Sequence, residues 1–76
     1  MKNIVVYTSS TCPYCTMAKD YLNQKNVEFV EKNVQIDAEA RNELMAKGHS
    51  GVPVIVIGDE EIVGFDRARI DQLIAE

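Results

Sequence analysis

From residue 8 to residue 15 the chain reads TSSTCPYC, and this stretch holds both of its cysteines. The apolar, β-branched run before it predicts a buried strand over residues 3–8. A helical pattern follows over residues 13–25, and Pro13 suits the first helical position because no hydrogen bond is required of its nitrogen there. Cys12 is therefore predicted to be the N-cap residue at the junction of a strand and a helix.

The spacing of apolar residues orients this first helix. Cys15, Ala18 and Leu22 recur at i, i+3 and i+7, which places them on one stripe. If that stripe faces a sheet, Cys15 is buried and Cys12 stands at the more exposed end of the helix. Asn26 is expected to stop the helix.

Five further segments follow. Asp37 and Asp66 carry the short acceptor side chains that cap helix N-termini, and Gly48 suits a helix C-terminus. Gly58 and Asp59 form a tight turn signal between a fully apolar run at 54–57 and the returning strand of a hairpin at 60–63. The predicted segments are a strand at 27–34, a helix at 38–47, strands at 54–57 and 60–63, and a helix at 67–75.

These segments predict an α/β fold. The second helix is expected to bury Ala40, Leu44 and Met45, and Phe65 is expected to pack on Ile70 as a hydrophobic staple. A strand, a helix-length crossover and a further strand form a parallel, right-handed unit. The order β-α-β-α-β-β-α predicts a single domain over all 76 residues, with a four-stranded mixed sheet and helices on both faces.

The composition weighs against several function classes. A formal net charge of −4 disfavours nucleic acid and anionic membrane surfaces, because both bind basic patches. No apolar stretch approaches the roughly 20 residues of a membrane span, and the first residues lack the pattern of a signal peptide. We expect a cytoplasmic monomer, in which a paired thiol is more often catalytic or metal-binding than structural.

The two cysteines predict thiol–disulfide exchange. Exchange requires a thiolate, and a helix N-terminus stabilises negative charge through its dipole and its free N–H groups. We therefore expect a lowered pKa at Cys12 and assign it the nucleophilic attack. Cys15, one turn further on, is assigned the second attack, which releases the reduced substrate. A disulfide between them closes too short a loop to stabilise the fold much.

Three other interpretations of the cysteine pair stay open. A zinc site needs about four ligands, and His49 is the other soft or borderline ligand that the chain offers. An iron–sulfur cluster shared between two chains, with Cys12 and an external thiol as ligands, would make the protein a carrier or sensor. Two buried cysteines without a chemical role are the third interpretation.

Four short motifs follow one another along the chain: Tyr7-Thr8, Cys12-Pro13-Tyr14-Cys15, Gly51-Val52-Pro53 and Val63-Gly64-Phe65-Asp66. With these motifs, essentially the whole chain resembles the glutaredoxins, within the thioredoxin-fold superfamily. The resemblance implies a thioredoxin-like fold. It also implies a thiol–disulfide oxidoreductase with no tightly bound cofactor and with glutathione as co-substrate.

The resemblance further implies a binding groove. Pro53 would be cis and lie against the dithiol, and the Val52 backbone would pair with the cysteinyl part of a substrate. Gly64 and Asp66 would hold the γ-glutamyl end of glutathione, and Arg41 would contact its glycine carboxylate. The full set of implied binding residues is Pro13, Tyr14, Arg41, Val52, Pro53, Gly64, Phe65 and Asp66.

Three positions depart from the glutathione-using members. Ser9 stands where a basic residue is usual, Val63 replaces a glycine and Arg67 replaces an aspartate. Lys19, one turn beyond Cys15, either brings positive charge to the site or is an ordinary surface lysine.

The sequence thus predicts a dithiol–disulfide oxidoreductase that reduces protein disulfides or glutathione mixed disulfides. The expected electron source is glutathione with glutathione reductase. The alternative is a short redoxin that thioredoxin reductase reduces and that donates electrons to ribonucleotide reductase.

Overall fold

The structure is a computed structural model that describes residues 3–49 and 51–75. Strands and helices follow in the predicted order. The elements are β1 (Ile4–Thr8), α1 (Pro13–Gln24), β2 (Val30–Asn33), α2 (Ala38–Ala46), β3 (Val54–Ile57), β4 (Glu60–Val63) and α3 (Arg67–Ala75). Within these described residues, no helix is long and apolar enough to cross a membrane.

The strands form a four-stranded mixed sheet in the order β2-β1-β3-β4. β1 pairs in parallel with β2 and antiparallel with β3, and β3 forms an antiparallel hairpin with β4. β1 therefore lies inside the sheet, as expected from its apolar residues on both faces. The chain leaves β1 directly into the cysteine motif, so the motif begins at the end of an interior strand.

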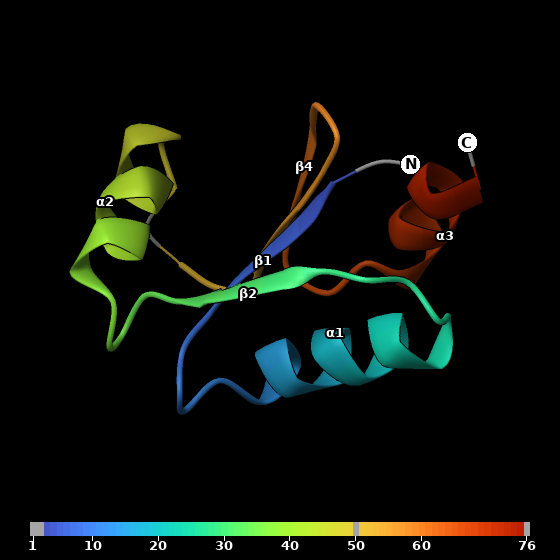
Figure 1. Ribbon diagram of the computed structural model, residues 1–76, viewed down its shortest axis with the longest axis horizontal. Coiled ribbons are helices and arrows are strands. Elements are labelled where there is room, and N and C mark those ends of the chain that lie inside the picture. Colours follow the sequence, from blue (N-terminus) through green and yellow to red (C-terminus); the bar gives the residue numbers. More distant parts are fainter. Residues whose placement is uncertain (1–2, 50, 76) are drawn as a thin grey trace.

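Helices cover both faces of the sheet, as predicted (Figure 1). One face, here called the α1/α3 face, carries the larger cluster, with Ile4, Val6, Ala18, Leu22, Ile55, Ile57, Ile62, Ile70 and Leu73. The opposite α2 face carries a small cluster of Tyr7, Leu44 and Val54. Alternate residues of each strand point to opposite faces, so β1 and β3 contribute side chains to both clusters.

The first helix has the predicted ends and the predicted buried stripe. Cys12 is its N-cap, with extended backbone, and Lys25 is its C-cap. Asn26 follows with a φ of 59°, in the left-handed region that asparagine tolerates better than most residues. Cys15 is buried together with Ala18 and Leu22, so the apolar spacing identified the face that packs on the sheet.

The second strand is shorter than predicted. Only residues 30–33 pair with β1, from the Val5–Val30 partners onward. Val27 and Phe29 are half-buried and pack against the α1/α3 cluster. Their apolar character thus reflects core packing without strand pairing, and the prediction of a strand from residue 27 was wrong.

The second helix also departs from prediction in one side chain. Ala40 and Leu44 are buried as expected, but Met45 is 62% exposed. Positions 40 and 44 are four apart and share one face of a helix, whereas position 45 is turned about 100° away. The helix α2 therefore covers its face of the sheet with a narrow stripe of two buried residues, Ala40 and Leu44.

The predicted helix caps are present. Asp37 Oδ1 accepts hydrogen bonds from the backbone N–H groups of Glu39 and Ala40, at 3.0 and 3.2 Å. Asp66 Oδ1 accepts from the N–H of Arg69 at 3.2 Å. Gly48 has a φ of 86°, which suits the residue after the Lys47 C-cap because glycine adopts this conformation without steric cost.

Candidate active site

Cys12 occupies the N-terminus of α1 as a capping residue. Its sulfur accepts a hydrogen bond from the backbone N–H of Cys15 at 3.1 Å, and its carbonyl oxygen accepts from the N–H of Thr16 at 3.3 Å. The residue is half-buried. A sulfur that accepts an N–H at the positive end of a helix dipole is suited to carrying negative charge.

Cys15 has the opposite surroundings. It is 1% exposed, and its burial, followed by its hydrogen bond with Cys12, raises the pKa of the Cys15 thiol to about 12. The backbone N–H of Ser9 and the charge of Lys19 lower the pKa of this thiol but do not outweigh the burial. The two sulfurs are thus unequal, with a more accessible Cys12 and a buried, protonated Cys15.

Residues distant in sequence hold the loop before Cys12. The N–H of Ser10 donates to Gln35 Oε1 at 3.0 Å, and Asn33 Nδ2 donates to Ser10 Oγ at 3.1 Å. The N–H of Val34 donates to the carbonyl of Thr8 at 2.8 Å. The turn after β2 therefore positions the cysteine loop. Sequence reasoning missed Asn33 and Gln35, because no local motif marks a contact across such a separation.

The Val52–Pro53 peptide bond is cis, as the resemblance implied. Tyr7 of β1 is the register partner of Val54, so Pro53 lies at the edge of the sheet where β1 ends and the cysteine loop begins. The carbonyl of Pro53 accepts the N–H of Gly64 at 2.8 Å. The segments at residues 52–53 and at Gly64 therefore meet at the edge from which the chain runs into α1.

Phe65 and Asp66 lie beyond this edge in different environments. Phe65 is half-buried, and its ring packs edge-on against Tyr21, with centroids 5.8 Å apart and planes at 70°. Its side chain therefore belongs to the core packing. Asp66 is exposed while it caps α3, so a structural role and a binding role are compatible in that carboxylate.

The remaining predicted site residues are surface groups. Tyr14 is 62% exposed, and Pro13 and Arg41 are exposed on α1 and α2. The Lys19 ammonium lies 2.8 Å from a carboxylate oxygen of Glu31, and the Arg67 guanidinium lies 5.3 Å from the centre of the Tyr21 ring. Two cations of this region therefore already have partners within the protein.

The fold agrees with that of known proteins. The family model described as Glutaredoxin matches residues 4–62. The chain belongs to the glutaredoxin family. Glutaredoxins are thiol–disulfide oxidoreductases, and this protein is one.

Several relatives match most of this glutaredoxin. An uncharacterized glutaredoxin-like 8.6 kDa protein in the rubredoxin operon of Clostridium pasteurianum is 47% identical over 72 residues, covering 93% of this chain and 96% of its own. Glutaredoxin 3 of Escherichia coli K12 is 40% identical over 67 residues, covering 87% and 81%. Among solved structures, the glutaredoxin-like NrdH-redoxin of Escherichia coli has a TM-score of 0.85 at 31% identity and 93% coverage of each chain.

Side chains of the metal-ligating types are spread over the described part of this glutaredoxin. Over residues 3–49 and 51–75, no group of three or more His, Cys, Asp and Glu side chains is arranged to hold a metal ion. His49 lies instead 2.5 Å from a carboxylate oxygen of Glu61. A cluster on Cys12 would need ligands from outside the chain.

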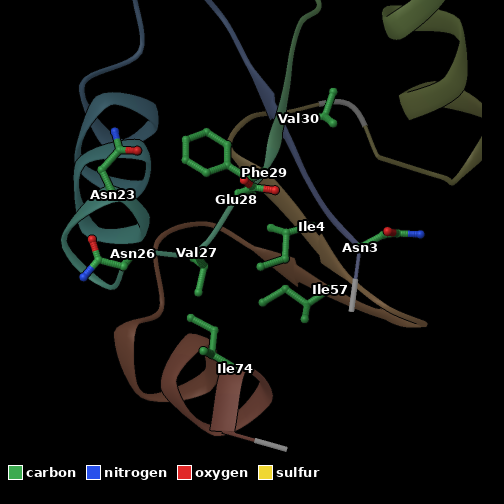
Figure 2. Close-up of a pocket in the computed structure, with 10 residues that line it drawn as sticks. All are labelled: Asn3, Ile4, Asn23, Asn26, Val27, Glu28, Phe29, Val30, Ile57 and Ile74. Carbon is green, nitrogen blue, oxygen red and sulfur yellow. The ribbon is translucent and has the colours of Figure 1, made fainter. Parts of the chain in front are cut away.

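A hollow of about 990 Å³ lies at the other end of the molecule, between the end of α1, α3 and the sheet (Figure 2). Its apolar lining includes Ile4, Val27, Ile57 and Ile74, and amide side chains such as Asn26 stand at its margin. Ile4 begins β1 and Ile57 ends β3, so the hollow is at the edge opposite to the cysteine loop. It contains none of the predicted site residues.

Proposed function

We propose that the protein reduces protein disulfides, and glutathione mixed disulfides, through Cys12 as nucleophile and Cys15 as resolving thiol. The observation that carries the proposal is the inequality of the two sulfurs. Cys12 is accessible and accepts the Cys15 N–H, whereas Cys15 is 1% exposed. An accessible sulfur at a helix N-terminus suits attack on a substrate, and a buried one suits an intramolecular second step.

The reaction proceeds in two exchanges. The Cys12 thiolate attacks one sulfur of the substrate disulfide, and the other substrate sulfur leaves with the electron pair and takes up a proton. Cys15 then loses its proton to solvent and attacks Cys12 Sγ, which releases the second substrate thiolate. The substrate disulfide gains two electrons, and Cys12 and Cys15 become the new disulfide.

The sheet edge beside the dithiol supports a binding role for the residues that the family resemblance implies. The Val52 backbone, next to cis-Pro53, is suited to pair with the extended backbone that flanks a substrate cysteine. Pro13 and Tyr14, exposed beside Cys12, are proposed to line the same groove. Gly64 and Asp66 are proposed as the contacts for a γ-glutamyl group.

The electron source is a finer proposal, and the placement of cations favours thioredoxin reductase over glutathione. Glutathione carries carboxylates at both ends and binds best where cations are available. Ser9 offers none, and Lys19 and Arg67 are engaged with Glu31 and with Tyr21. Exposed Arg41 is then left to meet one of the two carboxylates. The similar NrdH-redoxin of Escherichia coli has a thioredoxin-like activity profile. Ribonucleotide reductase is then a candidate electron acceptor, and glutathione is the second candidate donor.

Substitution of the two cysteines tests the assignment of roles. We predict that Cys12→Ser abolishes turnover of every disulfide substrate. Cys15→Ser should retain turnover of glutathione mixed disulfides, because free glutathione resolves the intermediate, but should lose reduction of protein disulfides. Persistent turnover by Cys12→Ser would show that another group attacks. The assay is a steady-state reduction coupled to NADPH oxidation.

The same assay distinguishes the electron sources. Wild-type protein is supplied either with thioredoxin reductase or with glutathione and glutathione reductase, with a protein disulfide as acceptor. We predict the faster turnover with thioredoxin reductase. Faster turnover with glutathione would reverse the order of the two donors while leaving the dithiol chemistry intact.

A further inference from the structure

Lys19, Glu31 and Thr8 form a hydrogen-bonded cluster on the face of the sheet that buries Cys15. Glu31 Oε2 accepts from Lys19 Nζ at 2.8 Å and from Thr8 Oγ1 at 2.9 Å. Thr8 is fully buried at the end of β1, and Lys19 follows Cys15 by four residues on the same side of α1. The cluster therefore connects the end of the interior strand, the edge strand β2 and the helix that carries the dithiol.

Among the described residues, this ion pair differs from two of the other lysine pairs and resembles the third, Lys32–Glu43, whose carboxylate also accepts from a buried hydroxyl, that of Tyr7. Lys25–Asp71 and Lys47–Glu61 are separated by 3.6 and 3.8 Å, and nothing buried anchors them among the contacts of the described residues. Exposed pairs of that kind contribute little to stability. Glu31, in contrast, is held by a buried hydroxyl, and its hydrogen bond with Lys19 lowers its pKa, so the carboxylate stays charged at neutral pH.

The cluster of Lys19, Glu31 and Thr8 can affect the ionisation of the Cys15 thiol through the charge of Lys19. Besides burial, the groups that shift the pKa of the Cys15 thiol include Cys12, the backbone N–H of Ser9 and the charge of Lys19. Cys12 disfavours ionisation of Cys15, whereas Ser9 and Lys19 favour it. Lys19 is the side-chain cation of this set, and its position depends on its partner.

We propose that Glu31 is a positioning residue that, anchored by Thr8, holds the Lys19 ammonium one helical turn beyond Cys15, where the positive charge speeds the attack of Cys15 on the mixed disulfide. This inference rests on the proposed function. In the assisted step Cys15 loses its proton to solvent, its sulfur bonds to Cys12 Sγ, and the bond between Cys12 and the substrate sulfur breaks. The substrate sulfur leaves with the electron pair and is protonated by solvent.

The expected size of the effect follows from two opposing trends. A one-unit fall in the pKa of an attacking thiol raises its thiolate fraction tenfold, but the thiolate becomes a weaker nucleophile. The net gain at a pH well below the pKa is about threefold. We therefore predict that Lys19→Gln slows the resolving step, by about threefold for each pKa unit that Lys19 contributes, and moves its pH profile to higher pH, while formation of the mixed disulfide is nearly unchanged.

The test is a single-turnover measurement with a glutathione mixed disulfide of a protein as substrate, over a range of pH. Formation of the mixed disulfide on Cys12 and release of the second thiol are followed separately. If wild-type protein forms no mixed disulfide, the proposed function fails. If wild-type protein resolves normally and Lys19→Gln resolves at the same rate with the same pH profile, only the present inference fails. Lys25→Gln, at the far end of α1, is the matched control and should behave as wild type.

A double substitution separates positioning from simple structural support. Glu31→Gln keeps an oxygen that can accept from Thr8 but removes the charge that holds Lys19. We predict that Glu31→Gln slows resolution in the wild-type background and has no further effect in Lys19→Gln. An equal slowing in both backgrounds would overturn the positioning role. Unfolding curves of each variant identify any loss of folded protein.

Discussion

The two faces of the sheet differ in how much core covers them. The α1/α3 face buries nine hydrophobic residues in one cluster, whereas the α2 face buries three. Cys15 lies on α1 and is buried on the α1/α3 face, whereas Val52 packs at the edge of the α2 face. The resolving sulfur is therefore held in a rigid setting, while the proposed substrate-binding backbone belongs to the half with less packing. Local stability usually follows such differences in burial.

Truncation of one buried leucine on each face is the strongest test of this difference. Leu22 is fully buried in the large cluster, and Leu44 is 3% exposed in the small one. Leu→Ala substitutions in cores cost about 2–5 kcal/mol, and the cost rises with the cavity that remains. We predict a loss near the upper end for Leu22→Ala and near the lower end for Leu44→Ala, measured by urea unfolding.

Met45→Ala is the control for the α2 substitution, because its side chain is adjacent in sequence and 62% exposed. Its effect should stay within about 0.5 kcal/mol. Hydrogen exchange adds a second measurement. We expect α2 amides to exchange through openings of lower free energy than those that expose α1 amides. Equal losses for Leu22→Ala and Leu44→Ala would contradict the contrast between the faces.

Alkaline pH provides the next largest effect, because each face buries one weak acid. Burial raises the pKa of Cys15, from an ordinary value of 9.0 to about 12, and burial also raises the pKa of Tyr7 on the α2 face. The folded protein then binds more protons than the unfolded chain above pH 9. The free energy of unfolding of the reduced protein should therefore fall between pH 9 and pH 12, by about 1 kcal/mol per pH unit from Cys15.

Two substitutions show how much of this fall in the free energy of unfolding with pH comes from each face of the sheet. Cys15→Ala should remove the part that begins near pH 9, and Tyr7→Phe should remove a part that begins at higher pH. The measurement is denaturant unfolding of reduced protein across the alkaline range. An unchanged slope in Cys15→Ala would mean that the Cys15 thiol ionises as readily in the folded protein as in the unfolded chain.

The smallest effect is expected at the edge of the α2 face. Glu43 Oε1 accepts from Lys32 Nζ at 2.6 Å and from the Tyr7 hydroxyl at 3.2 Å, and Lys32 lowers the pKa of Glu43. At a pH above the pKa that Glu43 has in the unfolded chain, the carboxylate therefore stabilises the fold. This stabilisation is lost as the pH falls through the lower pKa that Glu43 has in the folded protein. Glu43→Gln should lower Tm at neutral pH by less than Leu44→Ala does, and the difference from wild type should vanish in acid. Persistence of the difference in acid would assign it to packing.

The sequence determined much of the fold because local signals agreed with the tertiary structure. Apolar β-branched residues at 4–7 gave the interior strand, and Pro13 and Asn26 bounded the first helix. The prediction failed where apolar residues serve packing in other ways. Val27 and Phe29 fill core space without pairing, and Met45 lies one position outside a buried stripe.

The sequence predicted the chemistry of the candidate site, but it did not predict the contacts that position the site residues. Cys12 and Cys15 follow from a motif that is local in sequence, and the cis bond at Pro53 followed from family resemblance. The contacts that position these groups come from polar side chains such as Glu31 and Gln35, which any exposed segment of the chain could contain. Such contacts are set by the pairing of β1 with β2, so they emerge only when the strands are placed together.

The hydrogen bond from the Cys15 N–H to the Cys12 sulfur also sets a thermodynamic limit. A thiolate accepts this bond more strongly than a disulfide sulfur does, so the contact stabilises the reduced protein relative to the oxidised one. A thiol protein whose reduced form is stabilised becomes a stronger oxidant and a weaker donor of electrons. The helix cap that prepares Cys12 for attack therefore also restrains the delivery of electrons, and one contact balances speed against reducing power.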